Sequence, residues 1–175
     1  TTRNIYLAKI VGDMLDKIAK GEIEYQEVVQ DILDNEEFKK LYREPHHGIS
    51  RYLHVLRVSK LAFRFCKILR LKKIKEITRA ALLHDFYFDK DLEGYDAYER
   101  LSIHPYKALE NSLKYYELSD LECDIIEKHM YPHTKEKPKY FGSYLVSICD
   151  KLAAIYEMSR FKLALKLSIY LLFIY

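Results

Sequence analysis

Glycine and proline are scarce in this 175-residue chain, which contains five and four of them respectively. An all-β fold needs many turns, and tight turns depend heavily on these two residue types. Their scarcity therefore argues against an all-β fold and favours an all-α one. The length fits a single domain that can bury a core without disulfide bonds.

Cysteine is also rare, and the three present (Cys66, Cys123 and Cys149) form no CxxC pair. This spacing argues against a thiolate zinc site and against a disulfide framework. Each cysteine has apolar neighbours in a helical pattern and is expected to be a small buried residue. The first 20 residues carry charges throughout and lack the apolar block of a signal peptide. We therefore expect a protein of the reducing cytoplasm.

A strong excess of one charge is missing as well, because 29 Lys and Arg residues face 26 Asp and Glu residues for a net charge of +3. Binding to duplex nucleic acid usually requires a clear basic excess. The composition therefore argues against a nucleic acid duplex as partner. A small anionic substrate would need only a local basic rim.

No apolar run is long enough for a transmembrane segment. The most apolar stretch, FKLALKLSIYLLFIY at 161–175, is uninterrupted only after Lys166, which is roughly half the length of a spanning helix. We expect this tail to form a final helix docked on the core or on a second subunit, which would make a homodimer. Contact with a membrane surface is the alternative.

Apolar residues recur at helical spacing over most of the chain. The pattern predicts helices over 4–20, 22–33, 50–70, a short segment ending near 86, 103–116, 119–130 and 141–160. Gly21 is expected to end the first helix and Ser50 to cap the third. The turn around Pro45 marks a boundary. We therefore divide the chain into a helical N-terminal extension packed on the core (1–45), a main helical domain (46–160) and the apolar tail (161–175).

Histidines and two aspartates lie on the apolar faces of these predicted helices. His54 shares a face with Val58 and Leu61, and similar patterns place His84, His104, His129, Asp85 and Asp150 inward. A single inward histidine is usually a satisfied core residue. A buried carboxylate without a partner, however, costs several kcal/mol, on the order of a lost ion pair. Two inward aspartates among inward histidines therefore favour a metal site.

The order of these residues is a recognisable motif, H…HD…D. It is carried by His54, by His84-Asp85 in ALLHD and by Asp150 in SICDKLAA, with His104 in IHPYKAL and His129 in IIEKHMYP between them. The chain thus resembles the HD-domain superfamily of metal-dependent phosphohydrolases over about 46–158. The two extra histidines match its binuclear branch, which includes HD-GYP cyclic dinucleotide phosphodiesterases and bacterial dinucleoside tetraphosphate hydrolases.

The resemblance implies an HD-type helical bundle that holds two divalent metal ions. His54, His84, Asp85 and Asp150 would bind one ion, and Asp85 would bridge to a second ion bound by His104 and His129. Imidazole and carboxylate donors suit iron, manganese, zinc, nickel or cobalt. The implied reaction is the attack of metal-activated water on a phosphate ester or anhydride, in which Asp85, His84 and Lys151 would be catalytic. The implied substrate is a small phosphorylated molecule, a nucleotide or dinucleoside polyphosphate.

The sequence departs from these relatives in two ways. It lacks the GYP triplet and the HHE motif of the cyclic dinucleotide enzymes. His129 is followed by Met130 rather than by the threonine usual in the tetraphosphate hydrolases, whereas a His-Thr pair occurs at His133. His133 is therefore a reserve ligand or substrate-binding residue, with a solvated loop histidine as the alternative.

Four further residues are weaker candidates for binding substrate. Lys151 follows Asp150 and would reach a substrate phosphate, or else be solvated. Arg51 and Arg57 flank His54, and a guanidinium suits phosphate oxygens, but surface ion pairs explain them equally well. Lys107 shares a helix face with His104. The turn His46-His47-Gly48 would line the mouth of the pocket or simply cap the next helix.

Two other functions stay open at this point. Some HD relatives use diiron to activate oxygen with a similar ligand set, so an oxygenase is one alternative. A non-catalytic module that binds metal or nucleotide and reports to a partner is the other. The full ligand set in this sequence argues against the second.

Overall fold

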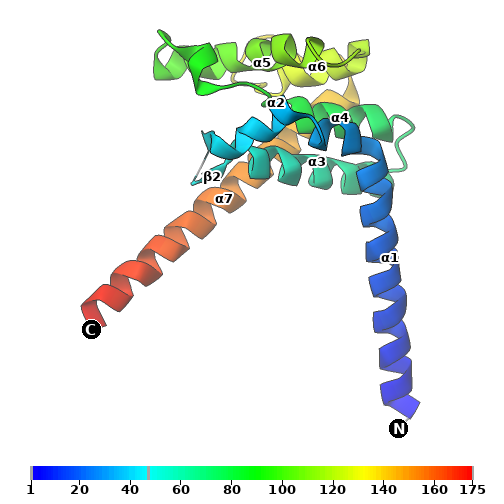
Figure 1. Ribbon diagram of the computed structural model, residues 1–175. Coiled ribbons are helices and arrows are strands. Elements are labelled where there is room, and N and C mark those ends of the chain that lie inside the picture. Colours follow the sequence, from blue (N-terminus) through cyan, green and yellow to red (C-terminus); the bar gives the residue numbers. More distant parts are fainter. Residues whose placement is uncertain (1, 47, 175) are drawn as a thin grey trace.

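In the computed structural model the chain is almost entirely helical, as predicted (Figure 1). The structure describes residues 2–46 and 48–174, and it describes side chains for 13, 15–17, 19–46, 48–159 and 163. The elements are α1 (Thr2–Leu33), α2 (Glu36–Lys39), η1 (Lys40–Arg43), β1 (Pro45–His46), β2 (Ile49–Ser50), α3 (Arg51–Ile68), α4 (Ile74–Leu83), η2 (Asp89–Leu92), α5 (Ala97–Leu113), α6 (Asp120–Lys128) and α7 (Phe141–Ile174). The two strands pair antiparallel as a minimal hairpin.

The helices form two packed layers with two projecting arms. α3 and α4 pack on each other, and the first part of α7 packs against both. α5 and α6 form the second layer, over α4. The N-terminal half of α1 and the C-terminal half of α7 extend away from the body on the side opposite to α5 and α6 (Figure 1).

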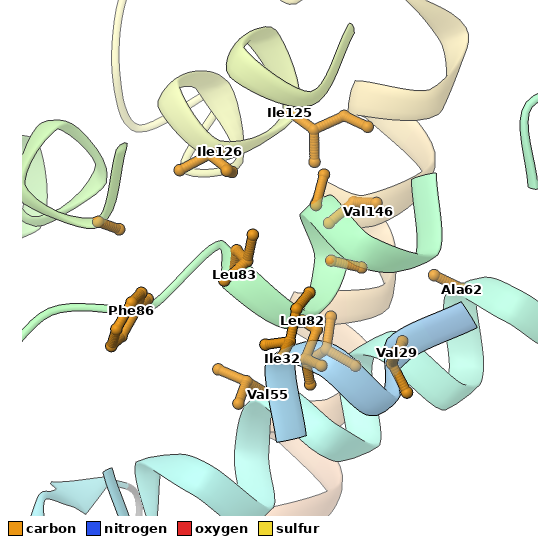
Figure 2. Packing of buried hydrophobic residues seen from close by; sticks show 14 of the residues in the cluster. Val29, Ile32, Val55, Ala62, Leu82, Leu83, Phe86, Ile125, Ile126 and Val146 are labelled. Carbon is orange, nitrogen blue, oxygen red and sulfur yellow. The ribbon is translucent and has the colours of Figure 1, made fainter. Parts of the chain in front are cut away.

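A single apolar core lies where these helices meet (Figure 2). The fully buried side chains labelled in Figure 2 come from α1, α3, α4, α6, α7 and the segment after α4, and they are Val29, Ile32, Val55, Ala62, Leu82, Leu83, Phe86, Ile125, Ile126 and Val146. Burying one large apolar side chain contributes about 1.5–3 kcal/mol. The core therefore holds α4 between α1, α3, α6 and α7, and it fixes the end of α4 from which His84 and Asp85 project.

Side-chain caps define where the central helices begin. Ser50 caps α3 by accepting a hydrogen bond from the Leu53 amide, as the sequence predicted. α5 begins at Ala97 rather than near Ile103, because Asp96 and Glu99 form a capping box. That earlier start adds nearly two helical turns before His104.

Two boundaries expected from the sequence fall inside continuous helices. Gly21 was predicted to end a helix, but α1 continues through it to Leu33. Glycine costs only about 1 kcal/mol inside a helix, and the packing of the second half of α1 on the core outweighs that cost. α7 likewise continues past Arg160, where the main domain was expected to end.

The predicted docking of the apolar tail on the core or on a second subunit concerns side chains that lie, with the exception of Leu163, outside those described. Within the described part of the chain, none of the helices combines the length and the apolar character needed to cross a membrane.

Candidate metal centre

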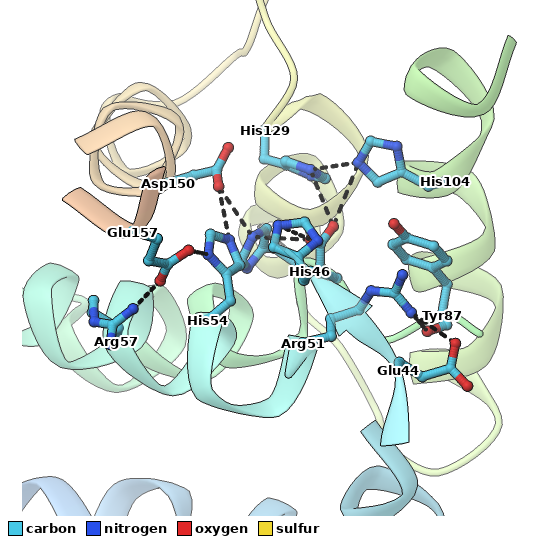
Figure 3. Close-up of polar contacts among 12 residues, drawn as sticks. Glu44, His46, Arg51, His54, Arg57, Tyr87, His104, His129, Asp150 and Glu157 are labelled. Carbon is cyan, nitrogen blue, oxygen red and sulfur yellow. Dashed lines mark hydrogen bonds and ion pairs between the residues drawn. The ribbon is translucent and has the colours of Figure 1, made fainter. Parts of the chain in front are cut away.

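The six residues predicted as metal ligands lie close together, and Figure 3 labels four of them, His54, His104, His129 and Asp150. They come from α3 (His54), from the end of α4 (His84 and Asp85), from α5 (His104), from the end of α6 (His129) and from α7 (Asp150). All are buried except Asp150, whose side chain is 14% exposed. The structure thus brings together residues that are up to 96 positions apart in the sequence.

One half of this cluster forms around Asp150. Its Oδ1 atom lies 3.0 Å from His54 Nε2 and 3.7 Å from His84 Nε2. One donor atom each from His54, His84 and Asp150 can be chosen so that all three lie within 4.8 Å of one another. This spacing is suited to a shared cation, because donors about 2.1 Å from one ion lie up to roughly 4 Å apart.

The other half forms around Asp85. Its Oδ1 atom lies 3.4 Å from His104 Nε2 and 3.6 Å from His129 Nε2, while its Oδ2 atom lies 3.9 Å from His84 Nε2. The two oxygens of Asp85 therefore face different histidines. This is the position that a carboxylate bridging two ions would occupy.

Backbone carbonyls fix which ring nitrogen of three histidines carries the proton. The Nδ1 atoms of His84, His104 and His129 each lie 2.8 Å from a carbonyl oxygen of their own helix. A carbonyl oxygen only accepts, so each Nδ1 donates its hydrogen and Nε2 is left with a lone pair. His84 and His129 stand at helix C-termini, where carbonyls lack helical partners.

The consequence is clearest for His104 and His129. Their Nε2 atoms lie 3.1 Å apart, and with Nδ1 protonated both present lone pairs to each other. Two lone pairs at this distance repel each other unless a cation or a shared proton lies between them. Histidine ligands of metals characteristically donate the other ring N–H to a carbonyl or carboxylate in this way.

His54 is oriented by a carboxylate instead of a carbonyl. Its Nδ1 atom lies 2.9 Å from Glu157 Oε2, and Glu157 also pairs with Arg57. Glu157 is buried, with 4% of its surface exposed. Glu157 is not among the residues predicted from the sequence, although its position seven residues after Asp150 places both on one face of α7.

Two of the donor atoms lack hydrogen-bond partners, which is a second reason why the cluster suits a divalent metal ion. His84 Nε2 and Asp85 Oδ1 are buried and have no hydrogen-bond partner among the described residues. Leaving a buried polar atom without a partner costs about 1–3 kcal/mol, and more for a charged group. Imidazole nitrogens and carboxylate oxygens without a thiolate suit first-row divalent ions. A bound metal ion would satisfy both unpaired atoms.

The crowding of buried imidazoles and carboxylates shifts their pKa values in the metal-free protein. Burial lowers the pKa of His54, but its bonds to Asp150 and Glu157 outweigh burial and raise the pKa to about 9. Burial, together with the nearby His84, lowers the pKa of His129 to about 3. Burial raises the pKa of Asp85, but the surrounding histidines lower it more, so this carboxylate stays ionised.

A cavity of about 590 Å³ opens onto the cluster. Asp85, His104, His129 and Asp150 lie in its wall, and cationic or polar residues from three segments surround them: Arg100 from α5, His133 from the loop after α6, and Lys151 from α7. Lys151 Nζ donates to Ser147 Oγ at 2.7 Å, and burial lowers the pKa of its ammonium. The cavity thus joins the donor cluster to a rim that suits an anion.

Two of the residues predicted to bind substrate line this cavity, Lys151 and His133. The ring of His133 packs edge-on against Tyr98 with the centroids 5.4 Å apart. Arg100 also lines the cavity, with Nε donating to Tyr95 O at 2.9 Å, and the sequence analysis missed it. Only the extended α5, which begins before the predicted start, brings Arg100 onto the same helix as His104.

Arg51 has a different place from the one predicted. A substrate contact or a surface ion pair was expected, yet Arg51 is only 3% exposed. Its guanidinium donates to Tyr87 O at 2.9 Å, Asp89 Oδ1 at 2.9 Å and Glu44 Oε2 at 3.2 Å. It also stacks over the Tyr87 ring at 3.9 Å. The guanidinium therefore ties Glu44, the residue before β1, to the segment after Asp85, and these bonds engage both of its terminal nitrogens, Nη1 and Nη2.

Arg57 and Lys107 also lie apart from the cavity. Arg57 pairs with Glu157 and faces the ring of Tyr156, on the side of α3 towards α7. Lys107 pairs with Glu110 at 3.0 Å on the solvent face of α5. The three-residue spacing from His104 did not bring Lys107 into the cavity, because the rotation along the helix over these three residues points the Lys107 side chain towards solvent. The structure therefore does not bring these two residues to the site.

His46 comes closer to the cluster than the sequence analysis anticipated. It was expected to line the mouth of the pocket or to cap a helix, and it does line the cavity. Its Nε2 atom also lies 3.9 Å from Asp85 Oδ2. His47 in the same turn lies outside the described residues.

Comparison with known proteins gives one match. A family model described as HD domain matches residues 51–155, which is more than half of the chain and includes all six clustered residues. No curated protein and no solved structure matches the chain.

Proposed function

The chain belongs to the HD domain family, and on this premise we propose that it hydrolyses a phosphate ester or anhydride with two divalent metal ions. HD domains are typically metal-dependent hydrolase domains. The donor cluster and the adjoining cavity supply the two parts that such a reaction needs, a place for the ions and a place for the substrate.

The first ion would be held by His54, His84, Asp85 and Asp150. The second would be held by Asp85, His104 and His129, so that Asp85 bridges the two. The single observation that carries this assignment is the pair of Nε2 lone pairs of His104 and His129, 3.1 Å apart beside the unpartnered Asp85 Oδ1. Without a cation, this arrangement is electrostatically unfavourable.

Metal ions bound there would lower the pKa of water and stabilise negative charge on phosphoryl oxygens. Residues of the protein would orient the ligands and attract the substrate. Backbone carbonyls and Glu157 hold the imidazoles in the orientation that ligation requires. Lys151 and Arg100 bring positive charge to the side of the cavity that a substrate phosphate would enter.

The cavity supports a small phosphorylated molecule as the substrate. Its volume of about 590 Å³ lies within the range of sites for small ligands. The ring of His133 in its wall, with the exposed ring of Tyr98 packed against it, offers a surface on which a nucleobase would stack. We therefore propose a nucleotide or a dinucleoside polyphosphate as the substrate class.

The test combines metal analysis with a substrate screen. The purified protein is expected to hold two divalent ions per chain and to hydrolyse at least one phosphomonoester, diester or anhydride. His84→Ala and Asp85→Ala should abolish metal uptake and turnover, whereas Lys107→Ala, which alters only the solvent face of α5, should retain both.

Two results would contradict the proposal. Unchanged metal content in both His84→Ala and Asp85→Ala would refute the ligand assignment. A folded, metal-loaded protein that is inert toward every phosphate compound in the screen would refute the reaction, and iron-dependent oxygen consumption by it would identify an oxygenase instead.

A further inference from the structure

Among the described residues of the β1–β2 hairpin, His46 has a ring that reaches the donor cluster. It stands at the end of β1, and its side chain is 17% exposed. Its ring lies 4.3 Å from the ring of His54, centroid to centroid, at an angle of 45°. Figure 3 shows the ring directed towards the cluster rather than away from it.

The distances around Asp85 Oδ2 are those of shared ligation and not of direct hydrogen bonding. His46 Nε2 lies 3.9 Å from this oxygen, beyond the range of a hydrogen bond. Two donors bound about 2.1 Å from the same ion lie about 3 Å apart at a right angle and up to about 4.2 Å apart when opposite. The spacing between His46 and Asp85 falls inside this interval.

His54 supplies a third donor beside His46 and Asp85. One donor atom each from His46, His54 and Asp85 can be chosen so that all lie within 4.8 Å of one another. Asp85 Oδ1 faces His104 and His129, whereas Oδ2 faces His84 and His46. His46 therefore approaches Asp85 on the side away from His104 and His129.

The hairpin that carries His46 is held in place by Arg51 and Glu44. The Arg51 amide donates to Glu44 O at 2.8 Å, and its guanidinium donates to Glu44 Oε2 and Tyr87 O. Glu44 Oε2 also accepts from the Asp89 amide at 2.7 Å. These bonds fasten the residue before the hairpin to the segment that follows Asp85. The position of His46 relative to Asp85 is thus fixed from both ends.

We propose that His46 is a seventh protein ligand of the metal centre, acting with His54 and the Oδ2 side of Asp85. The inference rests on the metal centre of the proposed function but not on its hydrolytic activity. It means that one face of the centre is closed by a two-residue strand rather than by a helix. The metal is a first-row divalent ion, since all three donors are imidazole or carboxylate.

The experiment is a Co²⁺ titration of the metal-free full-length protein, followed by visible absorption and by competition with a chelator. His46→Ala removes the donor, and His46→Gln keeps a polar side chain of similar reach but lacks the imidazole. Lys107→Ala is the control, because Lys107 pairs with Glu110 on the solvent face of α5, away from the cavity.

We expect both His46 variants to bind at least one Co²⁺ ion 10-fold or more weakly than the parent and to change the visible spectrum, since even residues behind the ligands alter affinity 10–100-fold. Lys107→Ala should match the parent in both measurements. Equal thermal unfolding of the metal-free proteins would show that the fold is retained.

Parental stoichiometry, affinity and spectrum in both His46 variants would overturn the inference and leave the proposed function intact. A parent protein that binds no Co²⁺ would overturn both. A protein that binds Co²⁺ through His46 but hydrolyses no phosphate compound would overturn the proposed function alone.

Discussion

Replacing Glu157 by alanine should weaken metal binding without touching any ligand. Glu157 accepts the hydrogen bond of His54 Nδ1 at 2.9 Å and pairs with Arg57, while His54 Nε2 faces Asp150. Without the carboxylate, the imidazole loses the partner that fixes its orientation and its tautomer. The buried Nδ1–H of His54 loses its acceptor, and Arg57, whose side chain is 37% exposed, loses its ion-pair partner.

Two independent estimates of the effect agree. A hydrogen bond to a charged group contributes about 1.5–3 kcal/mol. Mutating a residue that orients a metal ligand typically lowers metal affinity 10–100-fold, which corresponds to about 1.4–2.8 kcal/mol. Glu157 is 4% exposed, so solvent screening removes little of this energy. We therefore expect Glu157→Ala to raise the Kd for metal 10–100-fold.

The assay is competition for Co²⁺ or Mn²⁺ against a chelator of known affinity. Glu157→Gln should be intermediate, because an amide oxygen still accepts from His54 but carries no charge towards Arg57. Glu110→Gln, on the exposed face of α5, is the matched control and should bind like the parent. If Glu157→Ala bound metal as tightly as Glu110→Gln, the orienting role of this carboxylate would be refuted.

Three further predictions concern stability and substrate binding. In the metal-free protein, the pKa of His54 rises from 6.5 unfolded to about 9 folded, so its stabilisation is complete below pH 6.5 and is lost as the pH rises through 9. Urea unfolding in the presence of chelator should show a loss of about 3 kcal/mol across that window; a constant free energy of unfolding would contradict it. Gly142→Ala should lower the free energy of unfolding by about 1–3 kcal/mol, because a Cβ at this position would lie 2.9 Å from the side chain of Ile77 in α4. Gly21→Ala should raise the free energy of unfolding by up to about 1 kcal/mol, because a Cβ there would have no atom within 4 Å. Thermal or urea unfolding measures both changes. Arg100→Ala should raise KM for a phosphorylated substrate about tenfold, with Lys107→Ala unchanged in the same kinetic assay.

Periodicity predicted the parts of this structure that depend on local sequence. The helical fold, the N-cap at Ser50 and the inward orientation of His54 all follow from where apolar residues recur along a helix. Asp85 and Asp150 could be singled out because a buried carboxylate needs a cation. These inferences needed no knowledge of which helices pack together.

The features that could not be predicted from the sequence depend on contacts between distant segments. Arg51 has the local context of a surface residue, and only the fold brings Glu44 and Asp89 to its guanidinium. Gly21 has the local preference of a helix stop, which tertiary packing overrides. His46 belongs to a turn, and a turn gives no periodicity from which its direction could be inferred.

The ligand cluster draws one or two side chains from each of α3, α4, α5, α6 and α7. The two proposed ions would together join these five helices, as cross-links do, and the ion bound by Asp85, His104 and His129 would connect the α5–α6 layer to the layer beneath it. Since the unfolded chain cannot assemble these donors, binding of the ion would add directly to the free energy of folding. Chelation would then loosen α5 and α6 first, because the donors His104 and His129 attach that layer to Asp85.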